Sequence, residues 1–312
     1  MRILLTGASS FTGSWFAREL AAAGHEVTAT FTRAPGDYPD ELRRRRVAAV
    51  REVCHAVHGA SFGDDAFLAM VGSGRWDLLA HHGAEVTDYR SPTFDAVGAL
   101  QKNTRNLPRV LEALRAAGCG RVLLTGSVFE EGEGAGSDGL PSFSPYGLSK
   151  ALTARVFRFH CTRAGMGLGK FVISNPFGPH EEPRFTAYLV RSWLAGATPT
   201  CATPLYVRDN IHVSLLARAY ARFAAELPQG AGFRRLNPSG YVETQGTFAR
   251  RVAEEMRPRL GLPCALELKE QTQFAEPRVR ISTDVLDVAA LGWSEGAAWD
   301  ELARYYGERP GR

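Results

Sequence analysis

The chain has 312 residues, of which 45% are hydrophobic and 22% are charged, so it is long enough to bury a substantial core and has the composition of a globular protein. Its 37 basic and 33 acidic side chains leave a net charge of +4. Much of this excess comes from the run Arg43-Arg44-Arg45-Arg46, which follows acidic residues in a predicted helix. A solvated helix face explains the run, and we expect no nucleic-acid partner.

Neither a targeting segment nor a membrane segment is predicted. Met1 to Gly7 passes directly into a short apolar run and a glycine, without the longer apolar region and cleavage site of a signal peptide. No stretch reaches the length of a membrane span. The 5 cysteines are scattered without a Cys-x-x-Cys spacing, which is typical of reduced thiols. We therefore expect a cytoplasmic protein with no membrane association and no metal.

Short apolar runs alternate with helical patterns along the first half of the chain. Strands are predicted at 2–6, 27–31, 53–57, 77–81, 121–125 and 171–174. Helices are predicted after the first strand and at 94–117, 146–164, 187–194, 214–227 and 247–256, and the glycine-rich stretch 132–139 is predicted to be a loop. This alternation predicts an α/β fold with a doubly wound parallel (Rossmann) sheet over 1–170. The less regular part, 171–312, is expected to be a smaller substrate-binding lobe interleaved with the first domain.

A glycine-containing turn joins the first strand to the first helix. In Thr6-Gly7-Ala8-Ser9-Ser10-Phe11-Thr12-Gly13 the first glycine allows a tight turn and the last allows close helix packing. Ser10 replaces the middle glycine of the usual pattern, and a plain structural turn could have the same sequence. The position of the turn favours a site for a dinucleotide diphosphate. The predicted cofactor-binding residues here are Gly7, Ser9, Ser10, Phe11, Thr12 and Gly13.

The end of the second strand, Phe31-Thr32-Arg33, has no acidic residue. A carboxylate at this point would bind the ribose hydroxyls of NAD, whereas a cation would pair with the 2′-phosphate of NADP. Thr32 and Arg33 are therefore predicted to contact an NAD(P) cofactor, and Arg33 favours NADP. An exposed surface arginine would give the same pattern, so the choice between NAD and NADP stays open.

Tyr146 and Lys150 lie four residues apart, one turn from each other on one face of a predicted helix. A tyrosine is a poor base at neutral pH, but a neighbouring ammonium favours its phenolate and lowers its pKa. The phenol can then carry a hydroxyl proton while hydride passes to or from nicotinamide. A surface pair can have the same spacing. The pair follows the strand that ends in Thr125-Gly126-Ser127, whose hydroxyls are suited to bind a substrate oxygen.

Taken in order, these motifs resemble those of the extended short-chain dehydrogenases/reductases, in the nucleotide-sugar epimerase/dehydratase branch. His81-His82-Gly83-Ala84 stands where that family usually has His-Leu-Ala-Ala. The other matching elements are Asn103, the Thr125 segment, the Tyr146 and Lys150 pair, and the stretches 175–179, 208–213 and 291–293.

The resemblance implies a role for each matching residue. Thr125 would be the catalytic hydroxyl, with Ser127 as the alternative or as a substrate contact. Tyr146 would be the acid/base, and Lys150 would bind the nicotinamide ribose. Further cofactor contacts are implied for His81, Gly83 and Asn103, although a buried polar structural role suits the asparagine equally well. Contacts to the diphosphate of a sugar nucleotide are implied for Asn175 and Arg208, although the arginine could instead form a salt bridge.

Departures from the family pattern narrow the predicted activity. The 4,6-dehydratases have Asp-Glu directly after the catalytic threonine, whereas this chain has Gly126-Ser127, which disfavours that elimination unless Glu130 or Glu131 swings in. The predicted function is therefore an NAD(P)-dependent nucleotide-sugar epimerase or 4-ketoreductase. The alternatives are a dehydratase and a non-catalytic NAD(P)-binding sensor or scaffold. By family analogy, the helices at 94–117 and 146–164 imply a homodimer.

Overall fold

The computed structural model describes residues 1–137 and 139–308, which form two compact units. The first unit comprises Met1–Glu133, Leu140–Ile173 and Ala217–Asn237. The second comprises Gly134–Gly139, Ser174–Leu216 and Pro238–Arg312. Within the described residues, no helix is both long and apolar enough to cross a membrane.

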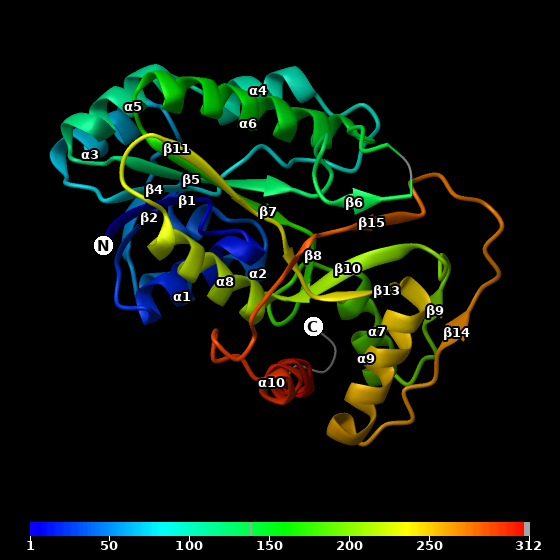
Figure 1. Ribbon diagram of the computed structural model, residues 1–312. Coiled ribbons are helices and arrows are strands. Elements are labelled where there is room, and N and C mark those ends of the chain that lie inside the picture. Colours follow the sequence, from blue (N-terminus) through cyan, green and yellow to red (C-terminus); the bar gives the residue numbers. More distant parts are fainter. Residues whose placement is uncertain (138, 309–312) are drawn as a thin grey trace. The chain divides into compact units, whose positions relative to one another are not determined.

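A seven-stranded sheet, parallel throughout, forms the centre of the first unit (Figure 1). Its order is β11-β7-β5-β4-β1-β2-β3. The strands are β1 (Arg2–Thr6), β2 (Glu26–Phe31), β3 (His55–His58), β4 (Leu78–His81), β5 (Arg121–Ser127), β7 (Gly167–Ile173) and β11 (Gly232–Leu236). The chain winds outward from β1 in one direction and returns to wind outward from β4 in the other. This topology confirms the predicted doubly wound sheet, and its switch point lies between β1 and β4, where such folds bind ligands.

Helices cover both faces of this sheet (Figure 1). One layer contains α1 (Phe11–Ala22) and α2 (Glu41–Arg51), together with α8 (Val213–Glu226), and the short 3-10 helix η1 (Pro35–Asp37) precedes α2. The other layer contains α3 (Asp65–Ser73), α4 (Ala96–Asn103), α5 (Leu107–Ala116) and α6 (Pro145–Arg163). Apolar side chains of α3, α5 and α6 pack on those of the strands, which include Leu79, Val122 and Leu168. This core fixes the carboxyl edge of the sheet, where the candidate site lies.

In its described residues, the second unit contains a smaller mixed sheet and three complete helices. Its sheet has the order β13-β10-β15-β6, with β8 paired to β10. These strands are β6 (Ala135–Gly136), β8 (Asn175–Phe177), β10 (Val207–His212), β13 (Tyr241–Thr244) and β15 (Val279–Ile281). Two small pairs join β9 (Thr200–Cys201) to β14 (Glu267–Leu268) and β12 (Pro238–Ser239) to β16 (Asp284–Val285). The apolar core of this unit is formed mainly by three helices, α7 (Phe185–Leu194), α9 (Gln245–Leu260) and α10 (Glu295–Gly307).

Two predicted elements differ in the structure. The predicted helix 94–117 is broken into α4 and α5, because Asn106 adopts a left-handed conformation with φ of +50° and Pro108 begins a new helical turn. The predicted loop 132–139 contains the short strand β6, which pairs antiparallel with β15. Asp138, which falls within that prediction, lies outside the described residues.

Candidate active site

The turn between β1 and α1 has the close backbone packing that a phosphate site requires. Gly7 has a φ of +78°, and a Cβ atom there would lie 2.6 Å from the backbone nitrogen of Gly83. A Cβ atom at Gly13 would lie 2.2 Å from the carbonyl oxygen of Gly7. Ser10 caps α1, since its Oγ accepts a hydrogen bond from the Gly13 nitrogen at 3.1 Å. The turn leads into the N-terminus of α1, which is the positive end of the helix dipole. Its backbone N–H groups can therefore bind a dinucleotide diphosphate.

All of the cofactor contacts predicted here lie in the turn after β1 or in the first turn of α1: Gly7, Ser9, Ser10, Phe11, Thr12 and Gly13. Thr32 and Arg33 follow directly after β2 and are exposed. The Arg33 guanidinium makes one long contact, from Nη1 to the Asp37 carbonyl oxygen at 3.5 Å. The carboxyl end of the second strand is where this fold receives the ribose of a dinucleotide, so the Arg33 guanidinium is available to an anion there.

His81, Gly83 and Asn103 connect the glycine turn to its neighbours. Thr6 Oγ1 lies 2.9 Å from His81 Nδ1 and accepts a hydrogen bond from the Gly83 nitrogen at 2.9 Å. His81 Nε2 donates to the Asn103 carbonyl at 3.2 Å, since a carbonyl can only accept. The Asn103 side chain accepts from the Glu85 nitrogen at 2.8 Å and donates to a hydroxyl of α6 at 3.2 Å. These contacts hold the framework together, and a direct contact with the cofactor stays a prediction for all three residues.

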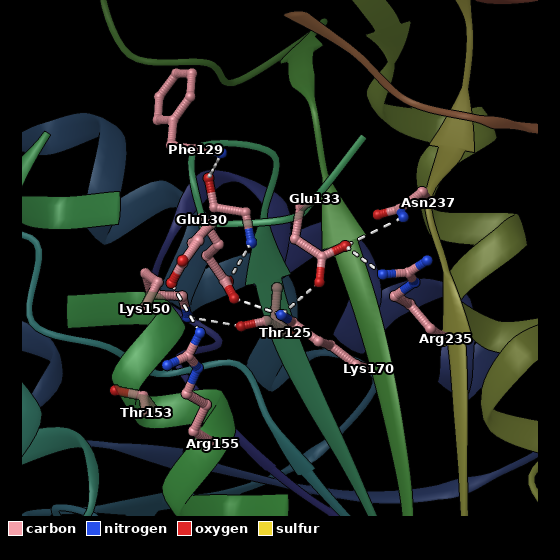
Figure 2. A network of polar contacts seen from close by, with 12 residues as sticks. Thr125, Phe129, Glu130, Glu133, Lys150, Thr153, Arg155, Lys170, Arg235 and Asn237 are labelled. Atoms are coloured by element: carbon pink, nitrogen blue, oxygen red, sulfur yellow. Dashed lines mark hydrogen bonds and ion pairs between the residues drawn. The ribbon is translucent and has the colours of Figure 1, made fainter. Parts of the chain in front are cut away.

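Tyr146 and Lys150 lie one turn apart in α6, which begins after the capping residue Ser144. Tyr146 is half-buried, and its ring centroid lies 5.2 Å from that of Tyr89 and 6.1 Å from that of Phe94. Lys150 is only 5% exposed, and its Nζ donates to the Thr125 carbonyl oxygen at 2.6 Å (Figure 2). Lys150 therefore faces the carboxyl-terminal half of β5 rather than bulk water.

The two candidate hydroxyls of β5 have different partners. Thr125 is buried, and its Oγ1 lies 3.0 Å from His82 Nδ1. Ser127 is also buried, and its Oγ accepts a hydrogen bond from the Phe129 nitrogen at 3.2 Å. Through its backbone carbonyl, Thr125 also contacts Lys150, and the catalytic role of its hydroxyl stays a prediction. A substrate contact of Ser127 stays a prediction.

The environment of Lys150 makes its ammonium easy to deprotonate. Burial lowers its pKa from 10.5 to about 8, with a positive charge on Lys170 acting in the same direction and a negative charge on Glu130 opposing both. The amine is therefore still mainly protonated near neutral pH. A cation at this position favours the phenolate form of a tyrosine one turn away, which is the chemistry that the pair requires.

A buried network of charges lies beside Lys150 (Figure 2). Lys170, on β7, binds Glu130 Oε2 and, at 2.7 Å, Glu133 Oε1. The second carboxylate has two further partners: Arg235 at 3.5 Å and Asn237 at 3.2 Å. Glu130 is completely buried, and its Oε1 accepts a hydrogen bond from the Ser127 nitrogen at 2.7 Å. Both oxygens of Glu130, which lies in the loop that follows β5, are thus engaged.

His82 links the glycine turn to Thr125, a contact that the sequence did not predict. Its Nε2 lies 3.0 Å from Ser10 Oγ and 3.1 Å from Thr12 Oγ1, while its Nδ1 lies 3.0 Å from Thr125 Oγ1. The Phe16 ring packs edge-on against the imidazole with the centroids 5.1 Å apart. The only sequence signal for this residue is a histidine where the resembling family has leucine. His82 thus connects the glycine turn to the Thr125 hydroxyl, and the Thr125 carbonyl connects β5 to Lys150.

The predicted substrate contacts Asn175 and Arg208 lie in the second unit, on the paired strands β8 and β10. The side-chain nitrogen of Asn175 donates to the Asp209 carbonyl at 3.3 Å. The Arg208 guanidinium binds Glu276 Oε2 at 2.9 Å and stacks on Tyr206 with its Cζ 4.4 Å from the ring centroid. The salt bridge that the sequence left open for Arg208 is present, and a role for either residue in binding a diphosphate stays a prediction.

Comparison with known proteins places these features in a family. Residues 3–237 match the NAD dependent epimerase/dehydratase family. A UDP-glucose 4-epimerase of Mycolicibacterium smegmatis is 25% identical over 305 residues, which cover 89% of this chain and 87% of that protein. The structure of UDP-glucose 4-epimerase from Thermotoga maritima with UDP-glucose matches with a TM-score of 0.72 at 18% identity, over 99% of both chains. DesIV, a dTDP-glucose 4,6-dehydratase from Streptomyces venezuelae with NAD and TYD bound, matches with a TM-score of 0.69 at 21% identity, over 100% of this chain and 98% of that chain.

A parallel sheet with a glycine turn after its first strand, and with a Tyr-x-x-x-Lys helix after β5, is the architecture of a dehydrogenase-type dinucleotide-binding protein. The family match extends over most of the chain, from residue 3 to residue 237. The chain therefore belongs to the NAD-dependent epimerase/dehydratase family, which confirms the resemblance seen in its sequence motifs.

Proposed function

We propose that this protein transfers hydride and a proton at a sugar carbon, in particular carbon 4, of a nucleoside-diphosphate sugar. The observation that carries the proposal is the buried Lys150 ammonium, one turn from Tyr146 and bonded to the Thr125 carbonyl at 2.6 Å. The M. smegmatis relative, a UDP-glucose 4-epimerase aligned over 89% of the chain, supports 4-epimerisation of a UDP-sugar as the leading reaction. Ketoreduction is the second candidate, because Arg33 favours NADP, the cofactor form that reductases consume.

Each catalytic residue has a distinct task. The bound nicotinamide would supply the hydride acceptor and donor, held by the glycine turn and by Lys150. Tyr146 would take the proton from the substrate hydroxyl and return it to the oxygen after hydride transfer. Lys150 would keep the phenol acidic through its charge. Thr125 would bind the same substrate oxygen through its hydroxyl.

The dehydratase alternative is disfavoured by the position of Glu130. Elimination across carbons 5 and 6 requires an acid and a base close to the sugar, and Gly126 and Ser127 supply neither. Glu130 is the nearest buried carboxylate to follow them, but both of its oxygens are engaged, by the Ser127 nitrogen and by Lys170. Glu131 is exposed and is paired with Arg155 at 2.7 Å. Neither carboxylate is placed as a free acid.

We further propose that Arg33 and Thr32 contact the adenosine ribose, with Arg33 favouring NADP. The Arg33 side chain is exposed at the end of β2, and no salt bridge to it is present among residues 1–137 and 139–308. An Arg33→Ser variant should lose affinity for NADP by about tenfold while its affinity for NAD changes little, because only NADP presents a 2′-phosphate. Fluorescence titration of both dinucleotides measures this difference, and equal losses for both cofactors would remove the assignment.

In the second unit, Asn175 and Arg208 would bind the diphosphate of the substrate. A guanidinium presents donors that match phosphate oxygens. In the structure Arg208 Nη1 donates to backbone carbonyls, whereas Nη2 binds Glu276 Oε2 at 2.9 Å. A diphosphate would have to displace the Glu276 carboxylate, whose side chain is 52% exposed. We also propose a homodimer, as the family resemblance implies, and a cytoplasmic location, which the scattered cysteines favour.

The test of the catalytic assignment is a Tyr146→Phe variant, with Tyr89→Phe as its matched control. The two rings are neighbours with their centroids 5.2 Å apart, so both changes remove a phenolic hydroxyl from the same region. Tyr146→Phe should lower turnover of UDP-sugars by about 10²–10⁴-fold, the contribution of general acid/base catalysis, and should keep its affinity for the dinucleotide. Tyr89→Phe should retain most of the turnover. Unchanged turnover in Tyr146→Phe, or none in the wild type with bound dinucleotide, would favour the sensor or scaffold alternative.

A further inference from the structure

His82 is in contact with both parts of the candidate site. Two hydroxyls of the glycine turn lie against its Nε2, from Ser10 at 3.0 Å and from Thr12 at 3.1 Å. The Thr125 hydroxyl lies against its Nδ1 at 3.0 Å. A Cβ atom at Gly13 would lie 2.8 Å from the imidazole Cδ2, so the ring packs directly on the backbone of α1.

The imidazole is neutral, because burial and the nearby charge of Lys150 lower the pKa of His82 to about 3. A neutral imidazole has one nitrogen that donates and one that accepts. The contacts of Ser10 determine which is which. Its single hydroxyl proton is donated to the Gly7 carbonyl oxygen at 2.9 Å, and its oxygen also accepts from the Gly13 nitrogen at 3.1 Å. With its proton on Gly7, Ser10 accepts from His82, and this arrangement places the ring proton on Nε2.

Protonation at Nε2 fixes the direction of the remaining hydrogen bond. The Nδ1 atom then has only a lone pair, so the Thr125 hydroxyl must donate its proton to Nδ1. A threonine hydroxyl has one proton and two lone pairs. With its proton committed to His82, Thr125 can only accept, both from the Tyr220 hydroxyl that also interacts with it and from a further group.

We propose that His82 is a positioning residue that orients the Thr125 hydroxyl as a hydrogen-bond acceptor and anchors it to the glycine turn. This proposal rests on the proposed function, in which Thr125 binds the reacting oxygen of the substrate. In the substrate-free site Thr125 can therefore accept a hydrogen bond from a substrate hydroxyl, and its own proton must turn from His82 to the substrate oxygen once Tyr146 has taken the hydroxyl proton. Through Ser10, the same imidazole couples the orientation of Thr125 to the turn that holds the dinucleotide.

Substitutions at His82 can remove its contact with Thr125 and its contact with Ser10 separately. An asparagine amide reaches the position of Nδ1, so His82→Asn keeps an acceptor for Thr125. A glutamine amide reaches the position of Nε2, so His82→Gln keeps a donor for Ser10. His82→Leu removes both. We expect His82→Leu to lower kcat and to weaken dinucleotide binding by about tenfold each, the value of one hydrogen bond. His82→Asn should restore kcat, and His82→Gln should restore dinucleotide affinity.

A double-mutant cycle tests whether His82 acts through Thr125. In a Thr125→Val background the oriented hydroxyl is absent, so adding His82→Leu should lower kcat no further, whereas the dinucleotide affinity should still fall. Additive losses in kcat would overturn the proposal. So would equal behaviour of the Leu, Asn and Gln variants.

The tautomer can be measured without turnover, which separates failure of this proposal from failure of the proposed function. In ¹⁵N-histidine-labelled protein, the two ring nitrogens of a neutral histidine give distinct NMR shifts for the protonated and unprotonated atom. We expect His82 to be protonated at Nε2 in the cofactor-free protein, and His81, held by the Asn103 carbonyl, serves as an internal reference for that tautomer. Protonation of His82 at Nδ1 would overturn the proposal even if turnover of sugar nucleotides were established.

Discussion

At the scale of single residues, Lys150 combines a catalytic role with a cost to stability. Its pKa falls from 10.5 to about 8 in the folded protein because the amine is buried. The unfolded chain restores the ordinary pKa, so between these two values it binds more protons than the native state does. Stability should therefore rise as the pH increases from about 8 to about 10.5.

Removal of the buried amine should stabilise the protein at neutral pH. Lys150→Met should raise the free energy of unfolding at pH 7 by about 1–3 kcal/mol, after allowance for the lost hydrogen bond to the Thr125 carbonyl. It should also abolish the rise in stability above pH 8. Urea unfolding followed by circular dichroism at pH 7 and pH 10 measures both effects. A less stable variant at pH 7 would mean that Glu130 compensates the buried charge more than we infer.

Sequence reasoning at this scale found residues that are close in the chain and missed partners that are distant. The spacing of Tyr146 and Lys150 is local and predicts a shared helix face. The contact of His82 with Thr125 spans 43 residues, and that of Lys170 with Glu130 spans 40. Neither distant contact has a local pattern, because each depends on the order of the strands in the folded sheet.

At the scale of elements, Gly63 fixes the junction between α4 and α5. It has a φ of +72°, and a Cβ atom there would lie 1.9 Å from the Arg105 carbonyl oxygen. Its own carbonyl accepts a hydrogen bond from the Asn106 side chain at 2.8 Å. The loop before α3 thus packs against the break between the two helices.

Two glycines with the same backbone conformation allow this packing to be tested. Gly59 has a φ of +73°, but a Cβ atom there would meet nothing within 4 Å. Gly59→Ala should lower the free energy of unfolding by about 1–2 kcal/mol, the penalty of the left-handed conformation alone. Gly63→Ala should lower the free energy of unfolding by about 2 kcal/mol more than that, because the backbone at Arg105 must also move. Chemical denaturation of the two variants gives the comparison, and similar losses in both would show that the junction yields easily.

The break itself shows why element boundaries were harder to predict than elements. Apolar residues continue at helical spacing through 94–117, which favours one long helix. The backbone conformation of Asn106, however, depends on its contact with Gly63, which lies 43 residues earlier. The strand β11 was not predicted, since four of its five residues are exposed and it lacks an apolar run.

At the scale of the whole molecule, the proposed homodimer has a candidate surface on α4 and α6. Val97 on α4 is 63% exposed and Phe159 on α6 is 58% exposed. The two helices pack on each other, so both exposed apolar side chains belong to one helix pair. These two helices lie within the segments whose family analogy implies the dimer.

The double variant Val97→Arg/Phe159→Arg should be monomeric, because two cations would have to be buried at the interface. Its mass from light scattering after size-exclusion chromatography tests this. Val285→Arg is the control, since Val285 is 92% exposed but lies in the second unit. A wild-type monomer, or a dimer that survives in the double variant, would place the interface elsewhere or remove it.

The fate of deuterium at carbon 4 of a UDP-sugar tests the proposed chemistry most directly. If Tyr146 moves only the hydroxyl proton while the carbon-bound hydrogen travels as hydride, turnover of the labelled UDP-sugar should be slowed by the label. The deuterium should remain on carbon 4 of the epimer, or appear on the nicotinamide if the sugar is oxidised. Nuclear magnetic resonance and mass spectrometry of the products follow both outcomes. Loss of the deuterium to water would mean that the carbon is deprotonated, and it would contradict hydride transfer at this site.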